Sequence, residues 1–236
     1  MKTTLTILAA LISAAAPVLT GCSRSPTSSS DVELSGIYTT YTLTTELGNP
    51  PTATAQFQIG DESGGYLDLA NGDAVSCADT PLVRVDSGDQ PLYRAVLPSE
   101  TSSFNFVFTR PGEPAYPRHV DASPPLRITT DALDGDYDSQ FDVAWTTEDT
   151  REGVVTIQGV STADGCPLTV LTTRAADIGK YSFDGSPFRP ADKSDPICNY
   201  TLQVMRDVGA TAGSPFAGGR AISRSIGSTP LRFHKQ

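Results

Sequence analysis

Three aspartates stand at alternate positions in the stretch 134–138, which reads DGDYD. The carboxylates of Asp134, Asp136 and Asp138 could bind a hard cation, because such oxygens are the ligands that Ca²⁺ prefers in proteins. The sequence therefore offers a candidate structural calcium site on these three residues. A solvated acidic turn explains the same spacing, and we favour that interpretation.

The stretch resembles the opening of an EF-hand calcium loop, but the following residues depart from that family. Counted from Asp134, the sixth residue is Ser139, where the EF-hand has glycine. The twelfth is Trp145, where the EF-hand has a bidentate glutamate. An EF-hand is therefore excluded, and a looser calcium site between two domains, as in some extracellular sandwiches, stays open.

Residues for covalent catalysis are scarce. The chain has two histidines, His119 in a proline-rich connection and His234 near the C-terminus, and it lacks a Gly-x-Ser-x-Gly elbow. The 27 acidic residues offer too many pairs to single out two for glycoside hydrolysis. The only tryptophan, Trp145, alternates with Phe141 and Val143 and is expected in the core. We therefore expect a protein that is not an enzyme.

The residues before Cys22 have the features of an export signal. Lys2 precedes an uncharged apolar run, residues 5–19, which is too short for a typical membrane span. The run ends in Leu19-Thr20-Gly21-Cys22, which resembles the lipobox of bacterial lipoproteins. This resemblance implies a type II signal peptide over residues 1–21 that is cut before Cys22. It also implies that fatty acids such as palmitate are attached to Cys22.

A lipidated Cys22 implies a cellular location for the protein. Several acyl chains anchor a protein stably in a membrane. Ser23, rather than aspartate, follows the cysteine, and in enteric bacteria this implies the outer membrane, on its periplasmic or surface face. Residues 22–32 are rich in serine and threonine and are expected to form a flexible tether. A plain secreted protein with Cys22 in a disulfide is the alternative.

Three further cysteines remain, and an exported chain can keep disulfides. We favour a Cys166–Cys198 bond, because both residues stand at predicted strand starts in the same half of the chain. Cys77 would then be a buried free thiol. The sequence alone does not fix the pairing.

The formal net charge of −10 comes without any basic stripe. This argues against a nucleic-acid partner and against electrostatic docking onto anionic lipid. The expected partners are therefore the membrane, through the lipid anchor, and an envelope protein or polysaccharide.

Alternation of apolar and polar residues predicts strands throughout the chain. Such strands bury one face and leave the other in water. Frequent Asn-Gly, Asp-Gly and Asn-Pro pairs separate them, a pattern typical of an all-β sandwich. The clearest alternations are FNFVF (104–108), FDVAW (141–145), CNYTLQV (198–204) and AQFQI (55–59).

An acidic stretch, residues 131–142, divides the chain into two expected sandwiches in tandem, 33–130 and 131–236. DIGKY (177–181) resembles the Asp-x-Gly-x-Tyr corner of immunoglobulin-like domains, although Phe183 stands where that family has cysteine. The two halves share a weak internal similarity. FVFTRPG and LQVMRDVG both carry an arginine after an apolar strand, at Arg110 and Arg206.

The sequence thus predicts a lipid-anchored cell-envelope protein that acts as a non-catalytic binding or structural module, with recognition assigned to its loops. A hydrolase tethered to the envelope and a calcium-dependent glycan-binding module are the alternatives.

Overall fold

The computed structural model describes residues 26–85, 90–130, 133–147, 154–161, 166, 171–189, 197–211 and 215–234. Strands dominate these ranges, and the helical elements in them are three single 3₁₀ turns. The all-β sandwich class is therefore confirmed, while the immunoglobulin-like topology stays a prediction. The 3₁₀ turns are η1 (Ser29–Asp31), η2 (Leu34–Gly36) and η3 (Ser186–Phe188).

One nine-stranded sheet runs through the whole molecule. Eight of its strands follow one another in a single path, and a ninth, β11, pairs with β17 beyond the end of β2. Threonine and valine are frequent in these strands, since β-branched side chains suit a pleated surface. In order they are β14 (Leu171–Ala176), β13 (Val154–Ser161), β16 (Cys198–Thr211), β17 (Gly218–His234), β2 (Ile37–Glu46), β3 (Thr52–Ile59), β8 (Leu92–Val96) and β7 (Val83–Val85), with β11 at Leu133–Asp136.

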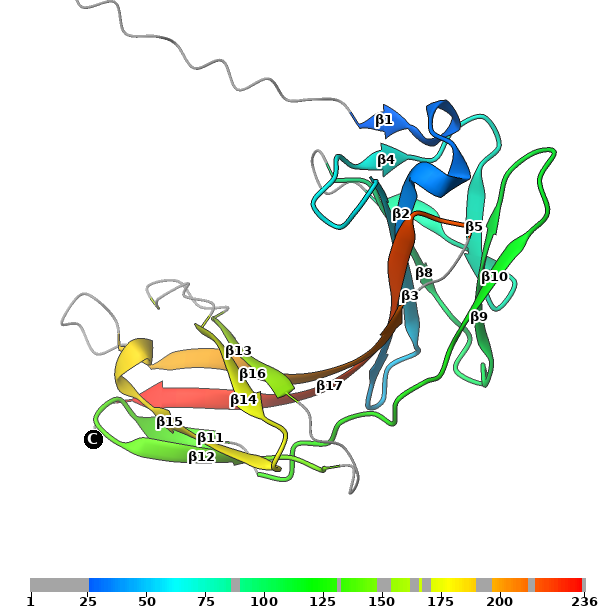
Figure 1. Ribbon diagram of the computed structural model, residues 1–236. Helices are drawn as coiled ribbons and strands as arrows, with labels where there is room; N and C mark the ends of the chain where they lie inside the picture. The colour runs from blue at the N-terminus through cyan, green and yellow to red at the C-terminus, as the bar shows by residue number, and fades with distance from the viewer. Residues whose placement is uncertain are drawn as a thin grey trace, which may run out of the picture.

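The long hairpin of β16 and β17 joins two lobes, and both strands bend on their way from one lobe to the other (Figure 1). The first half of β17 pairs in parallel with β2, and its last four residues pair in parallel with β11. β16 stays paired with β17 along its whole length, from Cys198 opposite Phe233 to Thr211 opposite Arg220. We call the part around β2 lobe 1 and the part around β11 lobe 2.

Smaller sheets complete the lobes. The second layer of lobe 1 has four strands and that of lobe 2 has two, and a short parallel pair lies at the start of the described chain. They are β10 (Tyr116–Val120), β9 (Phe104–Thr109), β5 (Ala74–Cys77) and β6 (Thr80–Pro81) in lobe 1, β12 (Gln140–Ala144) and β15 (Lys180–Asp184) in lobe 2, and the pair β1 (Thr27–Ser28) and β4 (Leu67–Asp68).

Each lobe has its own apolar core, and the predicted alternations fill both. Phe104, Phe106 and Phe108 are buried in lobe 1. Val143 and Trp145 are buried in lobe 2, together with Cys198, Tyr200, Leu202 and Val204. The alternation in 55–59 fails at its end, because Gln58 is buried and Ile59 is exposed. The Gln58 Nε2 donates to the carbonyl of Glu62 at 2.6 Å where the strand ends, so the amide is satisfied inside.

Some residues pack in the core on the other side of the expected division at residue 131. Leu126, which precedes that position, packs in the core of lobe 2. Ala221, from the second half of the chain, packs in the core of lobe 1. The division into two sandwich domains therefore stays a prediction, and the sheet itself is continuous across it.

Both second layers lie on the same face of the nine-stranded sheet. Along β17, Ala221 and Ser225 are buried in lobe 1, and Leu231 and Phe233 are buried in lobe 2. These residues differ by even numbers, and the register with β16 is unbroken, so their side chains leave the strand on one side. Figure 1 shows the second layers on the outer side of the bend. Among the described strands, no second layer covers the inner side, which we call the open face of the sheet.

The DIGKY corner forms a buried link in lobe 2. Gly179 has a φ of +82°, a value that suits glycine, and the carbonyl of Gly179 accepts from the Trp145 amide at 2.9 Å. Asp177 forms an ion pair with Arg206 of β16, and both side chains are nearly inaccessible to solvent. The Trp145 Nε1 also donates to Asp177, at 2.8 Å. The motif thus ties a turn, β16 and the core tryptophan together.

Candidate functional site

The open face in lobe 1 carries polar side chains in regular rows. The residues of β2 and β3 that point away from the core are mostly threonine, and all of them except the buried Gln58 are half-buried. Their hydroxyls can donate and accept hydrogen bonds at a surface. The rows run across both strands, with Thr40 opposite Gln56, Thr42 opposite Thr54 and Thr44 opposite Thr52.

Arg94 lies where these rows reach the edge of the sheet. It pairs with Thr54 on one side and with Val83 on the other, so its guanidinium shares their face. Arg94 is exposed, and it makes no hydrogen bond or ion pair to any residue within the described part of the chain. Val83 and Val96 beside it expose 63% and 58% of their surfaces, so exposed apolar side chains flank the Arg94 guanidinium.

Two shallow hollows share Arg94 and Val96. One, of about 250 Å³, is also lined by Thr44, Glu46 and Thr52, together with the turn residues Asn49 and Pro50. The other, of about 490 Å³, reaches the edge strand and is lined by Thr80, Pro81, Val83, Val85 and Ala95. Their linings combine the Arg94 cation, the Glu46 carboxylate, hydroxyls and exposed valines. Because Glu46 already accepts hydrogen bonds from Ser228 and Asn49, Arg94 can receive an anionic group of a ligand that also has apolar groups.

In lobe 1, the charged side chains of Arg224, Asp207 and Glu46 on the open face are already paired or hydrogen-bonded. Arg224 and Asp207 form a two-fold hydrogen-bonded ion pair at 2.7 Å for both contacts. These hydrogen bonds and the charge of Asp207 raise the pKa of Arg224. Glu46 accepts from Ser228 Oγ at 2.7 Å and from Asn49 Nδ2 at 2.8 Å. Arg94 differs from these groups because its charge has no such partner.

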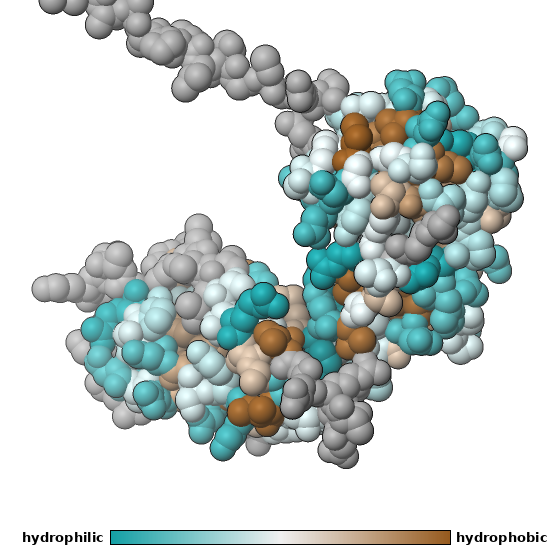
Figure 2. Space-filling view, in the orientation of Figure 1, coloured by the Kyte–Doolittle hydropathy of each residue, from teal (hydrophilic) through white to brown (hydrophobic). Residues whose placement is uncertain are grey.

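Tyr38 ends the open face near the start of β17. A Cβ atom added to Gly218 would lie 3.3 Å from one carbon of the Tyr38 ring, so the ring lies against the glycine backbone. The ring is half-buried as a result. Figure 2 shows the molecule hollowed between its lobes, with a mostly hydrophilic surface along the bend.

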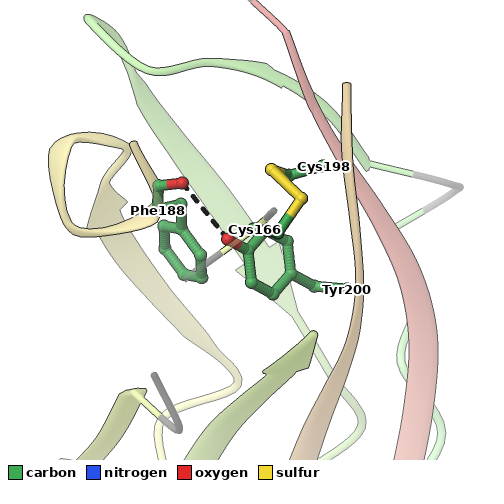
Figure 3. The surroundings of a disulfide bond; sticks show 4 residues. All are labelled: Cys166, Phe188, Cys198 and Tyr200. Carbon is green, nitrogen blue, oxygen red and sulfur yellow. Dashed lines mark hydrogen bonds between the residues drawn. A yellow bond between two sulfur atoms is a disulfide. The ribbon is translucent and has the colours of Figure 1, made fainter. Parts of the chain in front are cut away.

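The predicted disulfide is present. Cys166 and Cys198 are joined, with their Cα atoms 5.7 Å apart, and the bond lies beside the ring of Tyr200 (Figure 3). The Tyr200 hydroxyl donates to the Phe188 carbonyl at 3.2 Å. Cys77 is the buried free thiol that the sequence suggested, and burial raises its pKa to about 12. Cys22 lies outside the described residues.

Of the three aspartates of the candidate calcium site, Asp134 and Asp136 lie in β11 and Asp138 lies in the turn after it. Asp136 Oδ1 accepts from the Asp138 amide at 3.0 Å, and Asp138 forms an ion pair with Arg189. Asp134 stands opposite Arg232 in the β11–β17 pair. Within the described ranges, no three His, Cys, Asp or Glu side chains are grouped to hold a metal ion. The calcium site thus stays a prediction, and no role is derived from it.

His119 lies on β10, in the second layer of lobe 1 and away from the open face. Its Nδ1 lies 3.0 Å from Asn105 Oδ1 and its Nε2 lies 3.1 Å from Asp121 Oδ1. Among the residues that the structure describes, no serine hydroxyl is hydrogen-bonded to this ring. The His234 side chain lies outside the described residues, and Trp145 is buried as expected.

Sequence reasoning assigned recognition to loops and missed the open face and Arg94. A signal for the face was present, because Thr40, Thr42 and Thr44 alternate with buried residues along β2. The polar side of that alternation marked a broad hydroxyl surface. Nothing local marked Arg94, because β3, which places Thr54 opposite it, is distant in the sequence.

No known family model matches the chain, and no curated protein matches it. Among solved structures, it is similar to a tri-modular endo-β-1,4-glucanase of glycoside hydrolase family 5 from Bacillus licheniformis, at 9% identity and a TM-score of 0.28. It is also similar to the adhesin InvE of Yersinia pseudotuberculosis, at 11% identity and a TM-score of 0.23.

These alignments cover 85% and 83% of this chain but only 38% and 58% of the two solved chains. They carry no functional argument. Within the described residues, no helix has the length and apolar character needed to cross a bilayer.

Proposed function

We propose that this chain is a lipid-anchored protein of the Gram-negative cell envelope that acts as a non-catalytic binding module. The lipobox ending at Cys22 supports the anchor and an outer-membrane address. The open face around Arg94 supports binding, because it presents, in the lining of two hollows, a cation that has no partner among the described residues. That arrangement is the observation that carries the proposal.

The ligand we propose is an extended segment of an envelope protein that carries a carboxylate next to apolar side chains. Val83 and Val96 are exposed and would be covered by apolar side chains, with a gain of about 25 cal/mol per Å² buried. The carboxylate would form a charge-assisted hydrogen-bonded pair with Arg94.

The edge of the sheet supports an extended partner. β7 has one neighbour, β8, among the described strands, so its outer side presents main-chain groups to which another strand can add. A polysaccharide is less well matched, because Trp145 is buried and the Tyr38 ring is packed against Gly218, so neither offers a free stacking platform.

The test is photo-crosslinking in cells that make the full-length protein. A photoreactive residue at Val96 should capture a protein partner. The same residue at Val154, an exposed valine of lobe 2, is the matched control and should capture none of that partner. Capture of a polysaccharide at Val96, or equal capture at both positions, would overturn the proposed ligand.

Charge reversal at Arg94 should weaken the binding of this partner. Because the variant Arg94→Glu removes a charge-assisted contact and adds repulsion, we expect the partner's affinity to fall about tenfold to a hundredfold. Arg174→Glu makes the same charge change at an exposed site of lobe 2 and should leave affinity within about twofold. Titration of the captured partner against both purified variants measures the difference, and equal losses would contradict a role specific to Arg94.

A further inference from the structure

The first described residues are fastened to lobe 1 instead of hanging free. β1 pairs in parallel with β4, with Thr27 opposite Leu67 and Ser28 opposite Asp68. Immediately after β1, Ser29 is completely buried. Its hydroxyl donates to Asp73 at 2.7 Å and accepts from the Ala70 amide at 3.1 Å.

Arg110 is the centre of this attachment. Its guanidinium binds the Asp73 carboxylate at 2.6 Å, the Ser29 carbonyl at 2.8 Å and the Val32 carbonyl at 2.9 Å. The side chains of Arg110 and Asp73 expose only 15% and 2% of their surfaces. A buried ion pair of this kind, with its hydrogen bonds made, resists removal of either partner. We call residues 27–32 together with Arg110 and Asp73 the N-terminal clamp.

The clamp limits how far lobe 1 can stand from a lipid anchor at Cys22. Five residue steps separate Cys22 from Thr27. A fully extended chain spans at most about 3.6 Å per residue, so the anchor lies within about 18 Å of the clamp. This distance is much shorter than β17, whose 17 residues have a contour of about 55 Å.

The clamp also sets which end of the molecule is near the anchor. The Ala217 amide donates to the Ile37 carbonyl at 2.9 Å, next to η2, so β17 begins close to the clamp. β17 then runs away from it and ends in lobe 2. Figure 1 shows β1 and β4 at the end of lobe 1 that is farthest from lobe 2.

From this arrangement we propose that the bilayer is the interaction partner of the clamped end, so that lobe 1 lies against the membrane surface and lobe 2 projects away from it. The inference rests on the proposed lipidation of Cys22. The membrane-facing end carries acidic residues, among them Asp31, Glu33 and Asp61. The short span, and not attraction to anionic lipid, therefore keeps this end near the bilayer.

The orientation is tested with two dyes on the full-length lipidated protein. Glu33→Cys marks the clamped end and Lys180→Cys marks lobe 2, and the side chains of Glu33 and Lys180 are both exposed. Labelling is selective, because Cys77 is buried and Cys166 and Cys198 are paired. The protein is placed in phosphatidylethanolamine–phosphatidylglycerol vesicles that carry an acceptor dye on their headgroups.

Energy transfer to the acceptor should be severalfold greater from Glu33→Cys than from Lys180→Cys. A long Gly/Ser insertion between Ser25 and Pro26 should bring the two values together, because it releases the clamp from the anchor. Equal transfer from the two dyes in the chain of natural length would overturn the proposed orientation.

The clamp is tested apart from the lipid in a soluble chain with Cys22→Ser. Arg110→Ala should speed hydrogen exchange of the Val32 amide by at least about tenfold, while β9 stays protected. Ser29→Ala removes only the serine hydroxyl contacts and should act in the same direction, which covers the case in which Arg110→Ala unfolds lobe 1. An unchanged exchange rate of the Val32 amide in both variants would contradict the proposed role of the clamp contacts.

Failure of the proposed lipidation is distinguishable from failure of this inference. If the protein carries no acyl group at Cys22 by mass measurement, the anchor is wrong, and with it the membrane-facing orientation. If it is acylated and the dyes report equal transfer, the anchor stands and the orientation alone is wrong.

Discussion

Arg206→Met should lower the free energy of unfolding of lobe 2 by about 3–5 kcal/mol, because it leaves the Asp177 carboxylate buried without its partner. The side chains of Arg206 and Asp177 expose 6% and 4% of their surfaces. Arg206 Nη2 lies 3.0 Å from Asp177 Oδ1 and also donates to the Thr146 carbonyl at 2.8 Å. Urea unfolding followed by Trp145 fluorescence measures the loss, since this tryptophan belongs to the core of lobe 2.

The chain offers a matched control for this variant. Arg224→Met breaks an arginine–aspartate pair of similar geometry, but Arg224 and Asp207 expose 37% and 45% of their side chains. Exposed pairs contribute about 1 kcal/mol or less, so the control should change stability little. The double variant Arg206→Met, Asp177→Leu should regain much of the lost stability, because it buries no unpaired charge. Equal losses in the two single variants would contradict the role of burial.

The same pair predicts a dependence on pH. Burial alone would raise the pKa of Asp177, but the hydrogen bonds from Arg206 and Trp145 and the Arg206 charge hold it below its usual value. A lowered pKa in the folded state means that the unfolded chain binds more protons. The stabilisation is therefore complete above about pH 4, the ordinary pKa of aspartate, and is lost as pH falls through the folded value. The stability gap between the natural chain and Asp177→Asn should shrink over that acidic range.

The parts of the fold that local alternation controls were predictable. The three phenylalanines of β9 and the four apolar residues of β16 are buried as their spacing indicated. The long hairpin that joins the lobes was not predictable in this way. Its strand β17 pairs in parallel with β2, with Gly218 opposite Tyr38, and alternation carries no information about partners so far apart in the sequence.

The similar positions of Arg110 and Arg206 in the two halves have a structural basis that the sequence did not reveal. Both arginines form largely buried ion pairs, with Asp73 and Asp177, and both also donate to backbone carbonyls. An arginine after an apolar strand indicates neither its burial nor its partner. The candidate site around Arg94 was also missed. Local alternation does not indicate that β7 pairs with β8 and places the exposed Val83 opposite Arg94.

Removing the Cys166–Cys198 bond should cost lobe 2 about 3.7 kcal/mol, because the bond closes a long loop in the unfolded chain. The two cysteines are 32 residues apart, and the chain-entropy relation gives this value for a loop of that size. Cys198 opens β16 opposite Phe233, so the bond fastens the loop to the first pair of the central hairpin. The variant is Cys166→Ala, Cys198→Ala, since alanine leaves no polar group at these buried positions.

Urea unfolding followed by Trp145 fluorescence again reports on the correct lobe. The natural chain treated with a thiol reductant should lose about as much stability as the double variant, and the reductant should not affect the variant itself. Cys77→Ala is the control, because Cys77 lies in the core of lobe 1 and its loss should leave the Trp145 transition in place. A reductant effect below about 1 kcal/mol would show that the folded loop gains little from the bond, and that the packing of Phe188 on Tyr200 holds this region instead.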